Sequence, residues 1–207
     1  MEPEVTSALW DVEAAFVAHR VGGRRDTPTA SLVRVDDVDP AVLVPALGVT
    51  AGDAEDVRAL TPWLLRTAVT TDRLHLATAL DHIASFWHGW THTQREAVRD
   101  LVAALWRTLL DRHPGEVSAV AFLRAAAALG DGPERLLAIW EYKDIASADH
   151  HLADLVVDAF SGARVHPEVL AWALAPPQRE RVRRAFARDG DEPWAADLAA
   201  ASALLPD

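Results

Sequence analysis

The side chains best suited to chemistry are histidines and carboxylates that stand together near residue 150. His150 and His151 follow Asp149, and Asp154 comes three positions after His151, so this last pair shares one face of a helix. Such a pair can ligate a divalent cation, or provide an imidazole that a carboxylate orients for acid–base chemistry. Alternatively, Ser147 or Asp149 caps this helix, Asp154 complements the helix dipole and the histidines lie half-exposed. Because the sequence shows no third ligand, we predict no metal and no cofactor.

A second group of aromatic and imidazole side chains lies at a predicted helix junction around Gly89. Trp87 and His88 precede this glycine, and Trp90 and His92 follow it. The group could line a small-molecule pocket or form a hot spot for a protein partner. Alternatively, the two indoles fill the corner where two helices meet. Trp87 continues the apolar stripe of the preceding helix, so we predict that Trp87 is buried and that Trp90 keeps one edge in water.

One cluster of positive charge interrupts an acidic chain. Residues 178–188 contain five arginines and one glutamate, and Arg181 and Arg184 share a face of the predicted helix. This face fits an anion or an acidic partner. The alternative is a solvated helix whose arginines pair with the acidic residues that follow them. Because the net charge of the chain is −11, we expect no nucleic-acid partner.

Several catalytic and targeting signatures are absent from the 207 residues. There is no cysteine, which excludes disulfides, thiolate zinc sites and a cysteine nucleophile. No nucleophile elbow, dinucleotide-binding glycine motif or Walker loop is present. No apolar run approaches 18 residues, and the first residues are acidic rather than those of a signal peptide. We therefore expect a cytoplasmic chain with no membrane partner, and we lean against an enzyme.

The elements that must position these side chains are predicted to be helices almost throughout. Apolar residues recur at spacings of three and four, Thr91-x-x-Gln94 has capping-box spacing, and prolines and glycines mark the boundaries. We predict an all-α fold with more than about 60% helix, built from about eleven short helices. We expect these helices to stack as αα-hairpins, either in a HEAT-like array or in an irregular helical bundle. The predicted helices span residues 4–19, 40–47, 53–60, 62–69, 72–86, 91–113, 116–129, 134–142, 147–160, 167–174, 176–188 and 193 onward.

The remaining organisation is simple. Residues 21–38 have no helical period and are predicted to form a loop, in which Ser31 to Val35 favour a short strand. We predict a single helical domain over residues 1–207, with only a weak boundary near residue 89.

A resemblance rests on the aromatic pattern of residues 86–160, about a third of the chain. The block is similar to one in uncharacterised bacterial all-helical proteins, and it also resembles the αα-hairpins of HEAT-like solenoids. The likeness to HEAT-like solenoids implies a partner-binding surface, and neither resemblance assigns a catalytic residue. The high alanine content and the predominance of arginine over lysine indicate a high-GC bacterial source. The residues that carry it are Phe86-Trp87-x-x-Trp90-Thr91-x-x-Gln94, Leu105-Trp106, Phe122-Leu123 and Trp140-Glu141.

These observations predict a non-catalytic helical protein that presents a surface to another protein chain or to a second copy of itself. The alternative is a ligand-binding domain or small enzyme whose pocket is lined by the tryptophans and histidines named above. A concave apolar pocket with converging histidines would favour the alternative. A smooth helical face, or a two-fold contact above about 1,000 Å², would favour the interaction protein.

Overall fold

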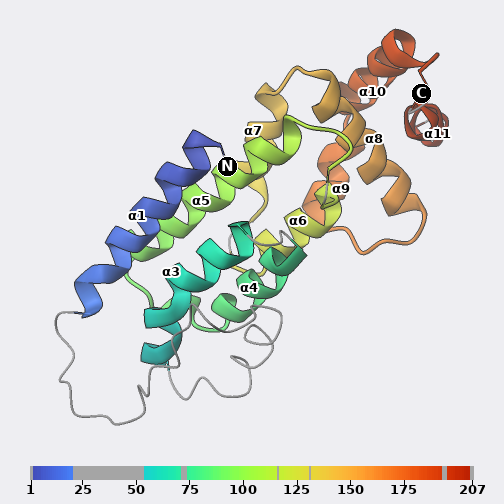
Figure 1. Ribbon diagram of the computed structural model, residues 1–207. Coiled ribbons are helices and arrows are strands. Elements are labelled where there is room, and N and C mark those ends of the chain that lie inside the picture. The colour runs from blue at the N-terminus through green and yellow to red at the C-terminus, as the bar shows by residue number, and fades with distance from the viewer. Residues whose placement is uncertain are drawn as a thin grey trace. The chain divides into compact units, whose positions relative to one another are not determined.

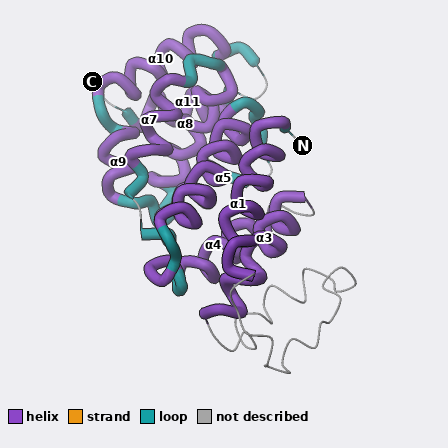
Figure 2. Tube along the Cα trace, turned by 90° about the vertical axis from the view of Figure 1, so that its left-hand side faces the viewer, coloured by secondary structure: helices purple, strands orange, loops and turns teal. Residues whose placement is uncertain are grey.

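The computed structural model describes residues 2–20, 54–70, 74–115, 117–130, 132–192 and 195–205. These residues form helices joined by turns, with no strand among them (Figures 1 and 2). The predicted all-α fold is therefore confirmed, whereas its HEAT-like character stays a prediction. The predicted loop over 21–38, its strand at Ser31 to Val35 and the helix over 40–47 lie outside the described residues.

The chain divides into two compact units, an N-terminal unit of Met1–Ala104 and a C-terminal unit of Leu105–Asp207. The prediction of one continuous domain stays a prediction. In the N-terminal unit, α1 packs on α3 and α3 packs on α4. The elements of this unit are α1 (Pro3–Arg20), α3 (Ala54–Thr70), α4 (Leu74–Ala84), the 3₁₀ turn η2 (Trp87–Gly89) and the first part of α5 (His92–Leu110).

In the C-terminal unit, the helix α8 lies at the centre. It contacts α6, α9, α10 and α11, and Leu152, Leu155 and Val156 on it are fully buried. Because these neighbours cover α8 on several sides, polar side chains on its covered sides lie in the interior of the unit. The further helices are α6 (Ala119–Ala127), α7 (Glu134–Tyr142), α8 (Ala146–Phe160), α9 (Pro167–Ala173), α10 (Pro176–Asp189) and α11 (Ala196–Leu204).

Local sequence signals set several helix ends as predicted. The Thr91 backbone N–H donates to Gln94 Oε1 at 3.1 Å, and the Gln94 N–H donates to Thr91 Oγ1 at 3.2 Å, which completes the capping box before α5. Pro167 and Pro176 open α9 and α10, where a missing N–H costs nothing.

The prediction of two helices separated at Pro62 is wrong, because α3 runs through this proline without a break. The buried residues Val57, Leu64 and Leu65 lie on both sides of it and hold the helix against its neighbours. The buried Thr61 hydroxyl also donates to the Val57 carbonyl at 2.7 Å. Packing of this apolar stripe offsets the backbone hydrogen bond that proline removes.

The predicted cap of α8 by Ser147 or Asp149 is also wrong. The N-cap residue is Ile145, and no side chain caps the helix. The Ser147 hydroxyl instead donates to the Leu110 carbonyl at 2.6 Å, and the Asp149 carboxylate pairs with Arg181. Both candidate capping side chains instead bind residues that are distant in the sequence.

The core of the N-terminal unit closes around two tryptophans, and the prediction that Trp90 is partly exposed is wrong. Trp87 is 2% exposed and Trp90 is 4% exposed. Their ring centroids are 5.5 Å apart, and Phe16 from α1 forms a T-shaped contact with Trp90, with ring centroids 5.0 Å apart. Phe16 therefore helps to bury the Trp90 ring, which we predicted to keep one edge in water.

We therefore expect Trp87→Ala and Trp90→Ala each to lower the free energy of unfolding by about 3–5 kcal/mol, the usual cost of emptying a buried aromatic site. Trp90→Phe should cost less, because Trp90 Nε1 is buried without a hydrogen-bond partner and phenylalanine removes that group. Urea denaturation measures all three variants. A Trp90→Ala variant within about 1 kcal/mol of the wild type would show that this ring is not core.

Candidate functional site

The structure does not bring the four predicted side chains of the Gly89 junction onto one surface. Trp87 and Trp90 are buried, whereas His88 and His92 are exposed. His92 Nδ1 lies 4.0 Å from Glu96 Oε1 on the next turn of α5. The junction is thus a buried aromatic contact with histidines on its outside.

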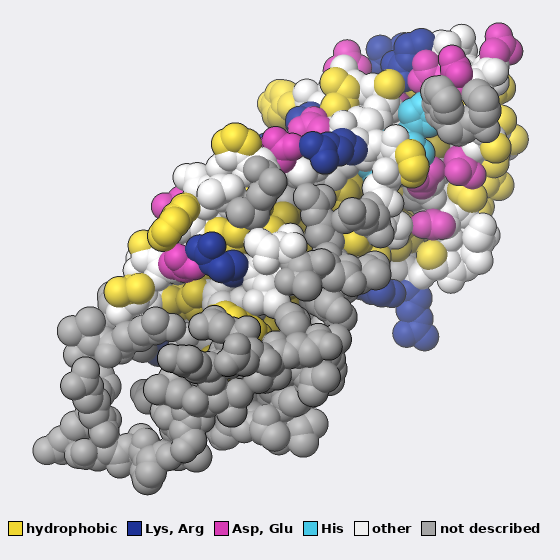
Figure 3. All heavy atoms as spheres, viewed as in Figure 1, with side chains coloured by type: hydrophobic (Ala, Val, Ile, Leu, Met, Phe, Trp, Pro, Cys, Tyr) yellow, Lys and Arg dark blue, Asp and Glu magenta, His cyan; other side chains and the backbone are white. Residues whose placement is uncertain are grey.

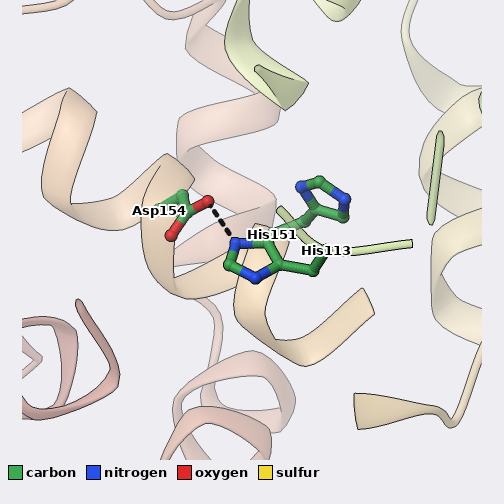
Figure 4. Close-up of side chains that lie close together, drawn as sticks. All are labelled: His113, His151 and Asp154. Carbon is green, nitrogen blue, oxygen red and sulfur yellow. Dashed lines mark hydrogen bonds and ion pairs between the residues drawn. The ribbon is translucent and has the colours of Figure 1, made fainter. Parts of the chain in front are cut away.

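The cluster near residue 150 is assembled differently, because the structure adds a third imidazole from outside α8. His113 Nε2 lies 2.8 Å from Asp154 Oδ2, as the dashed line in Figure 4 shows. The His113 ring meets the His151 ring edge-on, with centroids 4.9 Å apart. One potential ligand atom from each of these three residues lies within 4.8 Å of the other two. We call His113, His151 and Asp154 the histidine–aspartate cluster.

His151 is held in one orientation by backbone carbonyls. Its Nε2 lies 3.0 Å from the Leu109 carbonyl oxygen and 2.8 Å from that of Arg112. Carbonyls only accept, so Nε2 carries the proton and Nδ1 keeps its lone pair. The side chain is 2% exposed, and burial lowers the pKa of His151, although the two carbonyls partly oppose this shift. His151 is a neutral imidazole with Nδ1 available.

Gly115 allows the chain to close over this imidazole. A Cβ atom at position 115 would lie 3.3 Å from His151 Cε1 and 3.3 Å from the Val117 carbonyl oxygen. These distances are tighter than nearly all Cβ contacts. The turn between α5 and α6 therefore covers the ring closely because residue 115 has no side chain.

His150 adjoins the cluster but has its own partner. Its ring stacks on His113 with centroids 5.0 Å apart, and its Nε2 lies 3.3 Å from Asp189 Oδ2 at the end of α10. Asp189 also accepts hydrogen bonds from Arg188, which lower the pKa of the Asp189 carboxyl. His150 is thus a wall of the cluster, and the Asp154 carboxylate forms its hydrogen bond with His113.

Arg181 and Arg184 do not form one exposed face. Arg181 is buried, and its Nε donates to Asp149 Oδ1 at 2.5 Å. Its Nη1 donates to the Trp140 carbonyl at 3.0 Å, and its Nη2 donates to the Lys143 carbonyl. Arg184, three residues later, is exposed. The first arginine is a structural group inside the unit, and only the second could meet a partner.

Negative charge gathers beside the histidine–aspartate cluster. Burial raises the pKa of Asp158, and the neighbouring carboxylates of Asp154 and Asp197 raise it further. These three side chains come from α8 and α11, which pack together. The field on this side of the cluster favours a cation.

His113 is the one member of the cluster that the sequence did not indicate. It lies beyond the end of α5 and 38 residues before His151, so no helical spacing relates the two. The only local signal was its place at the predicted helix end before Pro114.

Comparison of the chain with protein-family models, curated proteins and solved structures gives no match. Within the described part of the chain, no helix is both long enough and apolar enough to cross a membrane.

Removal of the buried Arg181 side chain should lower the free energy of unfolding far more than removal of the exposed Arg184 side chain. We expect Arg181→Ala to lower the free energy of unfolding by about 3–5 kcal/mol, because it leaves the Asp149 carboxylate buried without its main partner. Arg184→Ala is the matched control and should change it by no more than about 0.5 kcal/mol. Thermal or urea denaturation compares the two. Equal effects would contradict the structural role of Arg181.

Neutralising Asp158 should stabilise the protein in a pH-dependent way. Its pKa in the folded chain is raised above the usual 3.8, so folding favours the protonated form and the charged form lowers stability as the pH rises. Asp158→Asn should therefore be more stable than the wild type at pH 7. This difference should shrink as the pH falls toward 3.8. Denaturation across this pH range tests the sign; a constant difference would contradict it.

Proposed function

We propose that this chain is a non-catalytic helical interaction protein that associates with a second copy of itself through the outer face of α1. Its HEAT-like arrangement, bacterial source and cytoplasmic location belong to the same proposal. The all-α fold and the resemblance of residues 86–160 support the HEAT-like arrangement. The observation that carries the proposal is an apolar stripe on the solvent side of α1.

The helix α1 is apolar on two opposite faces. Its inner face is buried and contains Val5, Leu9, Val12 and Phe16. Its outer stripe is exposed and contains Pro3, Ser7, Trp10, Ala14 and Val17. Trp10 is 62% exposed and Val17 is 51% exposed, and Figure 3 shows hydrophobic side chains at the surface over α1. Because the opposite face of α1 is already buried, an exposed apolar stripe on its outside suggests that a partner covers it.

Trp10 has the features of an interface anchor. The Arg66 guanidinium lies over its ring, 5.5 Å from the centroid, and Arg66 Nε also donates to Glu13 Oε1 at 2.7 Å. These contacts hold the indole in place before a partner arrives. Large aromatic side chains held in this way commonly supply most of the binding energy at an interface.

The spacing of the outer stripe fits a second copy of α1. Steps of four, three, four and three residues are those of a coiled-coil seam. The stripe is nearly symmetrical about Trp10, with the small residues Ser7 and Ala14 on either side. In an antiparallel pair, each indole would rest on the partner copy's small residues, as a self-complementary two-fold contact requires. Such a short interface is small, so we expect a concentration-dependent equilibrium.

Trp10→Glu should weaken this dimer without unfolding the chain, because it places a charge in the centre of the interface at an exposed position. We expect sedimentation equilibrium to show wild-type dimers within about 1 μM to 1 mM, and a loss of at least about thirtyfold in affinity for the variant. Tyr142→Glu is the control, since Tyr142 is 90% exposed but lies on α7. A monomeric wild type, or equal weakening by both variants, would overturn the proposal.

The antiparallel arrangement has a separate test, because the natural chain has no cysteine. In Ser7→Cys/Ala14→Cys, each new thiol would face the other position of the partner copy, and mild oxidation should give covalent dimers. The two positions are about 10 Å apart along one helix, which is too far for a bridge within a chain. Efficient cross-linking of Ser7→Cys alone would instead indicate a parallel pair.

A further inference from the structure

Two buried polar atoms without hydrogen-bond partners lie in the same cluster. They are His151 Nδ1 and Asp154 Oδ1. Buried polar groups are nearly always paired, so each exception calls for a physical explanation. Here one is a lone pair of a neutral imidazole and the other is a carboxylate oxygen. Both are acceptors, and a group that would satisfy both must carry positive charge or donate protons.

The surroundings of His151 match those of a metal ligand. Metal-binding histidines typically bind the ion through one ring nitrogen and donate the other N–H to a carboxylate or a backbone carbonyl. His151 donates Nε2–H to the carbonyls of Leu109 and Arg112, which directs Nδ1 away from them. Its orientation is thus fixed before any ion binds, and the buried ring has no room to turn away.

The other two members can complete a ligand set. His113 Nε2 and Asp154 Oδ2 are already 2.8 Å apart, and one potential ligand atom of each of the three residues falls within 4.8 Å of the others. Ligand atoms of a tetrahedral ion with bonds of about 2.0 Å lie about 3.3 Å apart. The side chains of His113 and Asp154 are 13% and 30% exposed, so they can adjust, and an ion can reach them from solvent.

We propose that His151 Nδ1, His113 Nε2 and the Asp154 carboxylate bind a divalent first-row transition-metal ion of the zinc type. Two imidazole nitrogens favour zinc and its neighbours over magnesium or calcium, which prefer oxygen ligands. The ion replaces the hydrogen bond between His113 Nε2 and Asp154 Oδ2, and the proton of that bond is released to solvent. Three protein ligands leave a fourth tetrahedral position for water or another group.

The charge around the cluster supports a cation. Asp158 follows Asp154 by one turn of α8, and no arginine or lysine is paired with the Asp154 carboxylate among the described ion pairs. Two arginines of α10 are paired with other carboxylates, since Arg181 and Arg188 bind Asp149 and Arg188 also binds Asp189. This site is independent of the α1 stripe, so either proposal can fail alone.

Isothermal titration of the full, EDTA-treated chain with ZnCl₂ tests the site. We expect saturable binding of one ion per chain, and no comparable binding of Mg²⁺. At a free zinc concentration of about 100 Kd, the melting temperature should rise by about 5–10 °C, because zinc binds only the folded chain. Co²⁺ should give a visible absorption band from its ligand field, which reports coordination directly.

Asp154→Asn and His113→Gln are the informative variants, because both positions are partly exposed and the changes preserve size. Each should weaken zinc binding by at least about 100-fold and abolish the Co²⁺ band. His151→Gln should do the same, provided that circular dichroism shows a folded chain. The matched control is His88→Gln/His92→Gln, which removes two exposed histidines from the N-terminal unit and should leave the affinity within about threefold.

Binding weaker than about 1 mM in the wild type would overturn the proposal. So would unchanged affinity in Asp154→Asn and His113→Gln, or a loss in the His88→Gln/His92→Gln control as large as theirs. The last result would assign the zinc to surface histidines.

Discussion

The buried ion pair between Arg181 and Asp149 is the interaction on which the C-terminal unit depends. A charge in a protein interior costs several kcal/mol unless an opposite charge and hydrogen bonds surround it, and here three helices supply them. Arg181 on α10 reaches the start of α8 and the last carbonyls of α7. Asp149 also accepts from Arg188. Asp189, which follows Arg188, is hydrogen-bonded to His150, and the His150 ring stacks on His113. The same network therefore forms one wall of the histidine–aspartate cluster.

The sequence predicts features that depend on near neighbours. The capping box of Thr91 and Gln94 and the prolines that open α9 and α10 act within one helical turn, and the structure confirms them. The buried stripe of α1 follows from its spacing for the same reason. Pro62 is the instructive failure, because its local preference predicted a break and the packing of α3 over two further turns outweighed it.

The features that the sequence could not predict depend on residues far away in the chain. Trp90 packs against Phe16, 74 positions earlier in the chain. Asp149 does not cap α8 as predicted, because its carboxylate pairs with Arg181, 32 positions later. His113 joins His151 only because the turn after α5 folds over α8. Two of the three members of the histidine–aspartate cluster, His151 and Asp154, could be predicted from their spacing on one helix. The ligand set as a whole required the tertiary fold.

The aromatic contacts also determine how the protein would respond to light. In the C-terminal unit the Trp140 ring lies 5.1 Å from Trp106 and 5.0 Å from Trp172, and in the N-terminal unit Trp87 and Trp90 form a separate pair. Indoles at such distances exchange excitation energy before they emit. Fluorescence from either group therefore reports the packing of a whole unit rather than the surroundings of a single tryptophan.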